Sequence, residues 1–320
     1  MSKRKVILFF SFLVLFLLSY LVLNKSIKLT QQNKQTYEVS VICRSENTEA
    51  WNTMKQGIDQ AAKDLNVDVS FITLSSRNNA KEQATFLNRE INNGADAVVI
   101  APVNSSDLNK SIEESMKKVP VIAMQSTITG ITGLQKISCD NTGMGKSLAQ
   151  ELKKSDPDGS EVVILKNSMD CSNVSDCARG IEAELKDRKL IYCDVPDDSG
   201  QAYYMARECL INHSSDTFIA LDAETLEAFG QAKKDLKGQS QLTKIYGVGR
   251  TNKVVSLLEE KVINAIAVEN DYNLGYLCIK SAVNRLHNKD DGSASINYLI
   301  VNSTNMYQSE SERMLFPFIR

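Results

Sequence analysis

Histidine is scarce in this 320-residue sequence, and an excess of basic charge is missing altogether. Only His213 and His287 occur, and the seven cysteines contain no Cys-x-x-Cys pair, so the ligand pattern of a zinc site is absent from the sequence. The formal net charge is −2 and the isoelectric point is about 5.9, which argues against a basic nucleic-acid-binding surface. The sequence therefore predicts no metal, no cofactor and no nucleic-acid partner.

Catalytic and DNA-binding signatures are also missing. The sequence contains no nucleophile elbow, metal cluster or histidine dyad, and no helix-turn-helix motif precedes its main part. Asp222 and Glu269 could still form a carboxylate pair for glycoside hydrolysis. A glycoside-processing enzyme is therefore the alternative to a binding protein, and mass spectrometry of a sugar after incubation separates the two.

The N-terminus lacks a small-residue cleavage site and a lipid-anchoring cysteine. Basic residues in 1–5 precede an apolar run over 6–23, and a polar segment over 25–36 follows. A spanning helix needs about 17–25 residues, whereas a signal-peptide core has roughly 7–15. We expect residues 1–36 to be an uncleaved anchor and tether with a cytoplasmic N-terminus and an extracytoplasmic remainder. A cleaved signal peptide is the alternative.

The number of cysteines is odd, so at least one has no partner within the chain. Outside the cytoplasm a disulfide can form. Cys171 and Cys177 flank a loop before a predicted helix and are the best candidates for a pair. Cys43, Cys193 and Cys278 fall in or beside predicted core elements, where cysteine acts as a small apolar residue.

Residues 38–65 set the pattern for the rest of the chain. A short, mostly β-branched run over 39–43 predicts a strand, polar residues 44–49 predict a loop, and apolar residues three or four apart over 51–65 predict a helix. The same alternation continues to residue 301. Because it is typical of parallel sheets, and more than ten strands are too many for one open sheet, we predict two α/β lobes with doubly wound parallel sheets.

Ligands of open parallel sheets bind beyond the carboxyl ends of the strands. Arg44, Asn47 and Trp51 follow the first predicted strand and should lie at such an end. Together with Arg179 and Arg250, Arg44 would place three arginines at the cleft mouth. Such a group suggests an acidic or phosphate-bearing ligand, unless these are solvated loop charges. Trp51 is also in phase with the apolar face of its helix, so core packing is its alternative role.

Several short motifs, each weak alone, stand in a definite order along the chain. They are Asn47…Trp51-Asn-Thr-Met-Lys-Gln-Gly57, Asn93-Gly-Ala-Asp-Ala-Val-Val-Ile-Ala-Pro102, Val119-Pro-Val-Ile122, Cys139-Asp-Asn-Thr-Gly-Met-Gly145, Arg179-Gly180, Ile245-Tyr-Gly-Val-Gly249 and Glu269…Gly275-Tyr276. Their order and spacing resemble the type I periplasmic sugar-binding proteins of the ribose- and galactose-binding kind, over about residues 37–301. The resemblance implies two lobes joined by a three-stranded hinge.

The resemblance also implies where the lobes begin and end. The crossings would lie near Cys139-Asp140, near Glu269-Asn270 and near Ile300. One lobe would comprise residues 37–139 and 270–295, and the other 140–269 and 296–320.

The ligand contacts that the family implies can be carried over by position. The corresponding residues are Asn47, Trp51, Gln125, Ser126, Arg179, Asp222 and Glu269, to which we add Arg44 and Arg250. Asn47 would hold a sugar hydroxyl, and Trp51 would stack on the sugar ring. Gln125 and Ser126 replace the Asp and Arg that are common in the family, and Arg250 follows a glycine where an Asp is expected. These departures concern ligand identity rather than fold.

The function implied by the resemblance is that of an extracytoplasmic solute-binding protein. It would capture a monosaccharide, polyol or sugar acid between its lobes and present it to a membrane sensor kinase or an ABC permease. Because the N-terminus carries an expected anchor rather than a lipidation cysteine, we favour the sensor.

Overall fold

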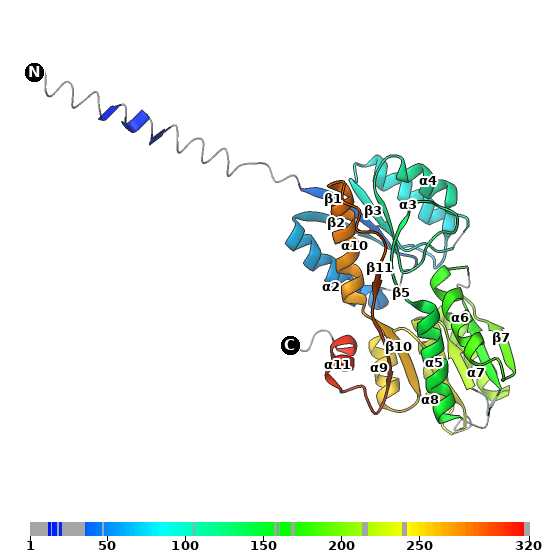
Figure 1. Cartoon of the computed structure of the whole chain (residues 1–320). Coiled ribbons are helices and arrows are strands. Elements are labelled where there is room, and N and C mark those ends of the chain that lie inside the picture. Colours follow the sequence, from blue (N-terminus) through cyan, green and yellow to red (C-terminus); the bar gives the residue numbers. More distant parts are fainter. Residues whose placement is uncertain are drawn as a thin grey trace, which may run out of the picture. The chain divides into compact units, whose positions relative to one another are not determined.

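The computed structural model describes residues 36–316, except 47, 105, 157–158, 160, 168–169, 213–216 and 239–241, and a few residues between 12 and 20 (Figure 1). The fold lies in the unit over residues 37–320. The expected anchor over 6–23 lies mostly outside the described residues. Among those that are described, no helix combines the length and apolarity needed to cross a membrane.

Strands and helices alternate through the larger unit, as the sequence predicts. The strands are β1 (Tyr37–Ile42), β2 (Val67–Ile72), β3 (Ala97–Ile100), β4 (Val121–Met124), β5 (Gln135–Cys139), β6 (Val162–Lys166), β7 (Leu190–Asp194), β8 (Thr217–Ala220), β9 (Lys244–Val248), β10 (Ala265–Glu269), β11 (Ala294–Ile296) and β12 (Tyr298–Asn302). The helices are α2 (Thr48–Leu65), α3 (Ala80–Asn92), α4 (Asn109–Met116), α5 (Asn141–Ser155), α6 (Ser172–Glu184), α7 (Ser199–Asn212), α8 (Ala223–Asp235), α9 (Asn252–Glu259), α10 (Asp271–Leu286) and α11 (Ser309–Leu315).

The strands form two six-stranded sheets. The first has the order β11-β5-β4-β3-β1-β2, and all of its neighbouring strands are parallel. The second has the order β12-β10-β9-β8-β6-β7, and only its edge strand β12 is antiparallel, to β10. The order 2-1-3-4-5 is the doubly wound, flavodoxin-like one, so the predicted fold class is confirmed.

Helices cover both faces of each sheet (Figure 1). In β1, Val39 and Val41 point to the side of α2 and α10, whereas Ile42 points to that of α3 and α4, because neighbouring strand residues face opposite ways. The second sheet lies between α5 with α6 and α7 with α8 and α9. Val41, Met144 and Ile296 belong to one apolar cluster, so one of the three apolar clusters has members in both lobes.

Four glycines of the family-like motifs allow pairs of helices to touch. A Cβ atom on Gly275 in α10 would lie 2.1 Å from the Met54 carbonyl oxygen of α2. Gly57 of α2 in turn lies as close to the backbone of α10. In the second lobe, a Cβ on Gly145 of α5 would lie 2.1 Å from the carbonyl oxygen of Cys177, and Gly180 of α6 faces α5 equally closely. These four glycines therefore reflect helix packing rather than ligand contacts.

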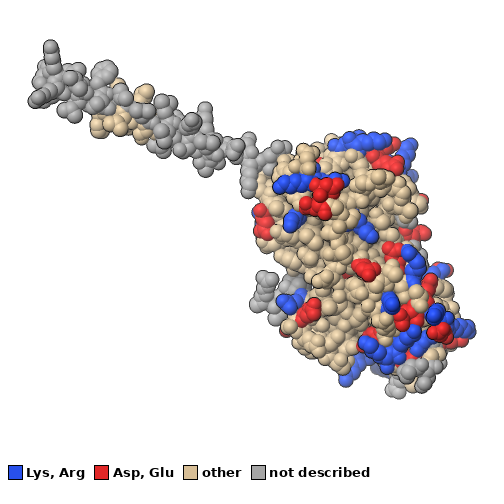
Figure 2. All heavy atoms as spheres, viewed as in Figure 1, with Lys and Arg blue, Asp and Glu red and all other residues tan. Residues whose placement is uncertain are grey.

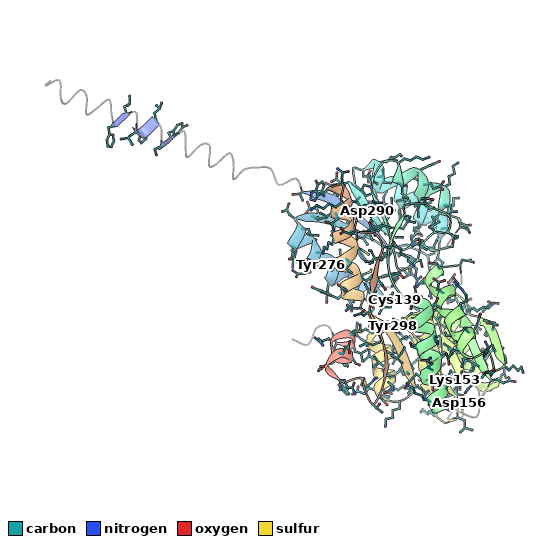
Figure 3. The ribbon with its side chains drawn as sticks, viewed as in Figure 1. Cys139, Lys153, Asp156, Tyr276, Asp290 and Tyr298 are labelled. Atoms are coloured by element: carbon teal, nitrogen blue, oxygen red, sulfur yellow. The ribbon has the colours of Figure 1, made fainter. Side chains whose placement is uncertain are left out.

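The chain crosses between the sheets after β5, after β10 and between β11 and β12. The third crossing thus precedes Ile300, which lies within β12. Cys139 and Tyr298 stand at these crossings (Figure 3). Cys139 Sγ donates to Glu269 Oε1 at 3.3 Å, and the Tyr298 hydroxyl lies 3.1 Å from Ser147 Oγ. Two of the three crossings are therefore linked to each other by a hydrogen bond.

The expected disulfide between Cys171 and Cys177 is wrong, because neither residue is bridged. Cys171 begins α6, and its Sγ donates to the Val103 carbonyl at 2.7 Å in the other lobe. Cys177 lies inside α6 on the side of α5 and is buried. Positions six apart on a helix do not share a face, so the two thiols point in different directions.

Basic and acidic side chains are intermixed on the face drawn in Figure 2. Pairs such as Lys153 with Glu184, 3.1 Å apart, and Lys154 with Glu151, 3.0 Å apart, occur along α5. Exposed pairs of this kind contribute at most about 1 kcal/mol each. The chain can pair its charges in this way because its 37 basic and 39 acidic residues nearly balance, which gives the net charge of −2.

Candidate ligand-binding cleft

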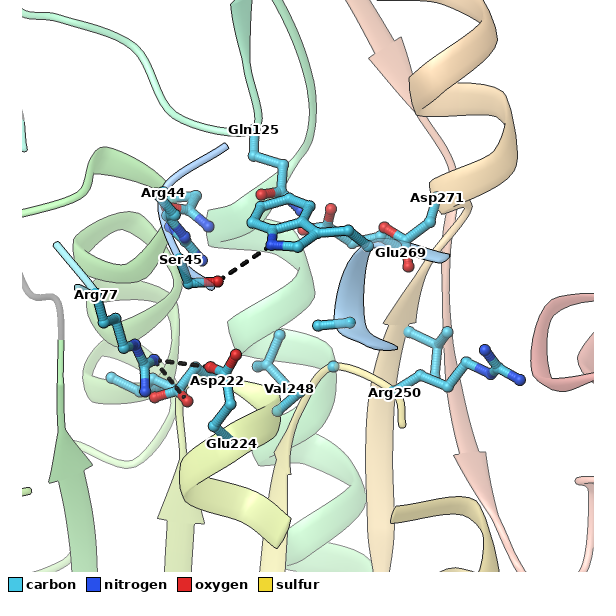
Figure 4. Close-up of a pocket in the computed structure, with 17 residues that line it drawn as sticks. Arg44, Ser45, Arg77, Gln125, Asp222, Glu224, Val248, Arg250, Glu269 and Asp271 are labelled. Carbon is cyan, nitrogen blue, oxygen red and sulfur yellow. Dashed lines mark hydrogen bonds and ion pairs between the residues drawn. The ribbon is translucent and has the colours of Figure 1, made fainter. Parts of the chain in front are cut away.

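A cavity of about 90 Å³ lies where the carboxyl ends of strands from both sheets face each other (Figure 4). The first lobe contributes Arg44 and Trp51, which follow β1, and Gln125, which follows β4. The second contributes Asp222 after β8, Arg250 after β9 and Glu269 at the end of β10. The structure therefore brings six of the nine predicted site residues to one cavity.

Of the other three predicted residues, Ser126 and Arg179 do not line this cavity. Ser126 lies just behind it and is 1% exposed, and its Oγ donates to Asn173 Oδ1 at 2.5 Å. The side chain of Arg179 is 66% exposed and pairs with Asp176 on its own helix, so the structure does not bring it to the cleft. Asn47 lies outside the described residues.

Trp51 belongs to the apolar core and also borders the cavity. It is 5% exposed and belongs to the same apolar cluster as Met54 and Ile58, which accounts for its helical phase. It also lines the cavity, and its Nε1 donates to Ser45 Oγ at 3.1 Å. This hydrogen bond fixes the plane of the indole ring, so a flat apolar surface borders the cavity.

Arg77, which the sequence analysis missed, joins the two lobes at the cavity. It lies between β2 and α3, and its Nη2 is 2.9 Å from Asp222 Oδ1 and 3.0 Å from Glu224 Oε2 (Figure 4). Asp222 also caps α8, since its Oδ1 accepts from the Thr225 amide at 2.9 Å. Burial acts to raise the pKa of Asp222, but the Arg77 guanidinium and the bonds from Thr225 outweigh it and keep the pKa below its usual value.

Further polar contacts cross the cleft on either side of this ion pair. Arg44 Nη1 donates to Asn173 Oδ1 at 3.1 Å, and the same oxygen accepts from Ser126. On the other side, Arg250 Nη1 donates to Thr53 Oγ1 at 3.1 Å, and its Nε donates to the Leu315 carbonyl at the end of α11. The lobes are therefore held in a closed arrangement.

Two acceptor oxygens at the cavity remain without a hydrogen bond among the described residues. They are Gln125 Oε1 and Glu269 Oε2, and both atoms are buried. In Figure 4 the two side chains point toward the same part of the cavity. Burial raises the pKa of Glu269, although the Cys139 thiol, Arg44 and Gln125 act in the opposite direction. A buried acceptor without a partner costs roughly 1–3 kcal/mol. A ligand that donates a hydrogen bond to either oxygen would therefore be bound more tightly.

Asp271 adds another carboxyl group to the cavity, at the first turn of α10. Burial and the neighbouring Glu269 raise its pKa to about 8, against the opposing effect of Arg250. Burial in turn lowers the pKa of Arg250, whose guanidinium turns toward α11. Asp271 therefore holds a proton near neutral pH.

The cavity residues that the sequence analysis missed lie, like the predicted ones, just beyond the carboxyl end of a strand. Arg77 follows β2, Glu224 follows β8, and Asp271 follows β10. The rule that ligands bind beyond the carboxyl ends of parallel strands points to all three, because it applies to every strand and not only to the first. Asn173 differs, because it is the second residue of α6, seven residues beyond the end of β6, and no spacing in the sequence singles it out.

The sequence from residue 39 to residue 290 matches the profile of the family described as "Periplasmic binding protein domain". The match covers most of the chain, and the chain belongs to this family of extracytoplasmic binding proteins. A search of curated proteins found no match.

Solved structures of sugar-binding proteins share the fold. One is a carbohydrate-transporter solute-binding protein from Agrobacterium radiobacter in complex with D-arabinose, with 20% identity, 88% of this chain and 99% of that chain covered, and a TM-score of 0.82. A second is the Caulobacter myo-inositol binding protein, with 20% identity, 87% and 97% coverage, and a TM-score of 0.78. The XylFII–LytSN complex is a third, with 16% identity, 84% and 99% coverage, and a TM-score of 0.77. At these identities the likeness establishes the fold.

Proposed function

We propose that this protein is a solute-binding protein that captures one small, neutral, carbohydrate-like ligand between its lobes. The observation that carries the proposal is the pair of buried acceptors, Gln125 Oε1 and Glu269 Oε2, at a cavity that Trp51 also lines. A sugar or polyol supplies hydroxyl donors for such oxygens and a C–H face for an aromatic ring. Neighbours of the same fold bind D-arabinose and myo-inositol, which supports this ligand class.

A neutral ligand fits the charges of the cavity better than a sugar acid does. Of the three arginines there, Arg77 is paired with two carboxylates, and Arg250 turns its guanidinium to Thr53 and the Leu315 carbonyl. Arg44 is then the one arginine left to face an anion, beside the carboxyl group of Glu269. An acidic ligand would also have to approach the unpartnered oxygen of Glu269.

Capture requires the lobes to open, because ligand sites typically measure roughly 300–1,000 Å³ and the cavity is far smaller. We propose that residues 37–139 with 270–295, and 140–269 with 296–320, move as two bodies about the three crossings. Hinge closure around a ligand is common in proteins built this way. The contacts of Arg77 and Arg250 across the cleft would break on opening and form again on closure.

A thermal-shift screen tests the proposal. A panel of neutral monosaccharides and polyols is compared with the matching uronic acids and sugar phosphates. At a hundredfold excess over its Kd, a ligand of the folded state adds about 2.7 kcal/mol of stability, so at least one neutral compound should raise the melting temperature. A shift with acids alone would overturn the neutral-ligand assignment, and no shift across the panel would overturn carbohydrate binding.

A glycoside-processing enzyme is the second candidate, because the pKa of Asp222 is lowered and that of Glu269 is raised, as in an acid–base carboxyl pair. The oxygens of Asp222, however, are occupied by Arg77 and Thr225. In this arrangement Asp222 caps α8 and pairs with Arg77, so its carboxylate is not free to contact a substrate. Recovery of every panel sugar unchanged by mass spectrometry would support the binding function, and a hydrolysed glycoside would support the enzyme.

The closed lobes would present the solute to a membrane partner, which we propose to be a sensor kinase, with an ABC permease as the alternative. The XylFII–LytSN complex supports this, since a protein of the same fold there binds a second protein. An uncleaved N-terminal anchor would hold the lobes near such a partner and raise their effective concentration. Solute would then act by a population shift, because the partner would fit the closed face alone.

Cell fractionation and gene deletion test the proposed anchor and membrane partner. The protein should keep its N-terminus and remain with the membranes. Deletion should abolish the transcriptional response to the solute and leave its uptake largely intact. Loss of uptake with an unchanged transcriptional response would favour the permease.

A further inference from the structure

Cys193 and Cys209 lie side by side on the outer edge of the second lobe, with their Sγ atoms 3.6 Å apart. Cys193 is in β7, the edge strand that pairs with β6, and Cys209 is in α7. Both are partly exposed, whereas each of the other five cysteines is at most 6% exposed. An oxidant in solution can therefore reach this pair and none of the others.

The fold itself directs the two thiols toward each other. Along β7, Cys193 and Ile191 pack against the cluster that contains Ala206 and Leu210 of α7. Tyr192 points to the other face, where its hydroxyl bonds to Glu182 of α6. Alternation along the strand thus places Cys193 under α7, and Cys209 neighbours Leu210 on that helix.

We infer that Cys193 and Cys209 form a reversible disulfide in the extracytoplasmic compartment. The bond requires the sulfurs to approach from 3.6 Å to about 2.05 Å, a movement of less than 2 Å for two partly exposed side chains. Disulfides persist outside the cytoplasm, which is where members of this family work. Among the described residues, no other two cysteines bring their sulfurs within hydrogen-bonding distance of each other.

Oxidation by a small disulfide such as oxidised glutathione balances in two steps. The Cys193 thiolate attacks one sulfur of the small disulfide, which forms a mixed disulfide and releases one glutathione thiolate. The Cys209 thiolate then attacks the Cys193 sulfur and releases the second glutathione. The two protein thiols lose two protons and two electrons, and these appear as two molecules of reduced glutathione.

The surroundings of the pair predict slow oxidation near neutral pH. The hydrogen bond with Cys193, burial and the charge of Glu208 all raise the pKa of Cys209. Since the thiolate is the attacking species, the reaction should accelerate as the pH rises.

The bond would close the loop between β7 and α7, which reaches the other lobe. Asp197 lies in this loop, and its Oδ1 accepts from Asn78 Nδ2 at 3.1 Å across the cleft. A disulfide constrains the unfolded chain and stabilises the folded one. Oxidation should therefore stabilise the second lobe and restrict the segment that carries Asp197.

Peptide mapping of the full-length protein tests the inference. Reduced protein is incubated with oxidised glutathione at pH 8, and all remaining thiols are then alkylated under denaturing conditions. The expected product is two mass units lighter, carries five alkyl groups and yields one peptide that links Cys193 to Cys209. Seven alkyl groups, glutathione retained on both cysteines, or a link between other cysteines would overturn the inference.

Three variants sharpen the result. Cys193→Ser and Cys209→Ser should each retain one glutathione on the remaining thiol and give no link. Cys171→Ser with Cys177→Ser is the matched control and should keep the link. A second measurement needs no variant: oxidised wild-type protein should melt several degrees higher than reduced protein and exchange the backbone amides of Val195, Asp197 and Asp198 more slowly. Equal melting and equal exchange in a cross-linked sample would contradict the predicted stabilisation.

Discussion

Arg77 and Asp222 come from different lobes, yet Arg77 Nη2 lies 2.9 Å from Asp222 Oδ1, with the two side chains 12% and 4% exposed. A second bond from the same nitrogen reaches Glu224 at 3.0 Å. An ion pair buried to this degree is stable only while both partners are present, because a lone buried charge is costly. Opening the cleft returns Arg77, Asp222 and Glu224 to water. The ion pair therefore favours the closed state only while both of its partners are present.

Replacement of Arg77 should therefore open the cleft. Arg77→Ala leaves Asp222 and Glu224 without a counter-charge in the closed state, and the lobes should part to hydrate them. We expect a larger radius of gyration by small-angle X-ray scattering without ligand, and an affinity for the solute at least tenfold lower, since charged hydrogen bonds contribute roughly 1.5–3 kcal/mol. Arg179→Ala, which removes an exposed arginine, is the control, and a scattering curve for Arg77→Ala that matches it would contradict the role of the pair.

Trp51 should report ligand binding directly. It is the single tryptophan of the chain and lines the cavity, so its fluorescence should change when the solute enters. Trp51→Phe should retain most packing against Met54 and Ile58 and keep part of the affinity, whereas Trp51→Ala should lose more of both. An emission spectrum that stays constant at saturating ligand would assign Trp51 to the core alone.

The pH dependence of stability should carry the signature of Asp271. Its pKa is about 8 in the folded protein and about 4 when unfolded, so between these values the folded state holds a proton that the unfolded state has lost. The contribution of this proton to the free energy of unfolding is complete below about pH 4. It declines as the pH rises to 8, by at most about 1.4 kcal/mol per pH unit. The lowered pKa of Asp222 acts in the opposite sense, and only at acidic pH.

Urea unfolding at pH 5, 6, 7 and 8 measures this difference. Asp271→Asn should gain stability relative to the wild type as the pH rises, because it has no proton to lose. Parallel stability curves for the two proteins would show that Asp271 ionises normally.

The close contact of α10 with α2 at Gly275 should be measurable in the free energy of unfolding. Gly275→Ala places a methyl group 2.1 Å from the Met54 carbonyl oxygen, so α10 must move away from α2, and overpacking of this kind costs roughly 1–3 kcal/mol. Gly200→Ala in α7 meets a single side-chain atom at 3.4 Å and should be neutral or stabilising by up to about 1 kcal/mol. Chemical denaturation compares the two, and equal midpoints would contradict the close contact.

The sequence predicted the fold more fully than the site, and the reason is physical. Alternating strand and helix patterns depend on local burial, so the two sheets follow from the periodicity that begins at residues 38–65. Helix α11 escaped prediction because it is short, yet its last carbonyl holds Arg250. The partners of a charged loop residue depend on which distant loop faces it, and no local pattern shows that Arg77 meets Asp222 rather than solvent. The Cys171–Cys177 prediction failed for the same reason, since spacing alone does not give direction.

Titration calorimetry with the neutral sugar or polyol that gives the largest thermal shift tests the central claim most directly. The wild-type protein should bind one ligand per chain. Glu269→Gln keeps the shape of the side chain but removes its charge, and should bind about fivefold more weakly, because charged hydrogen bonds exceed neutral ones by roughly 1 kcal/mol. Arg179→Ala should bind as the wild type does. Wild-type affinity in Glu269→Gln, or an equal loss in Arg179→Ala, would contradict a ligand held at the buried acceptors of this cleft.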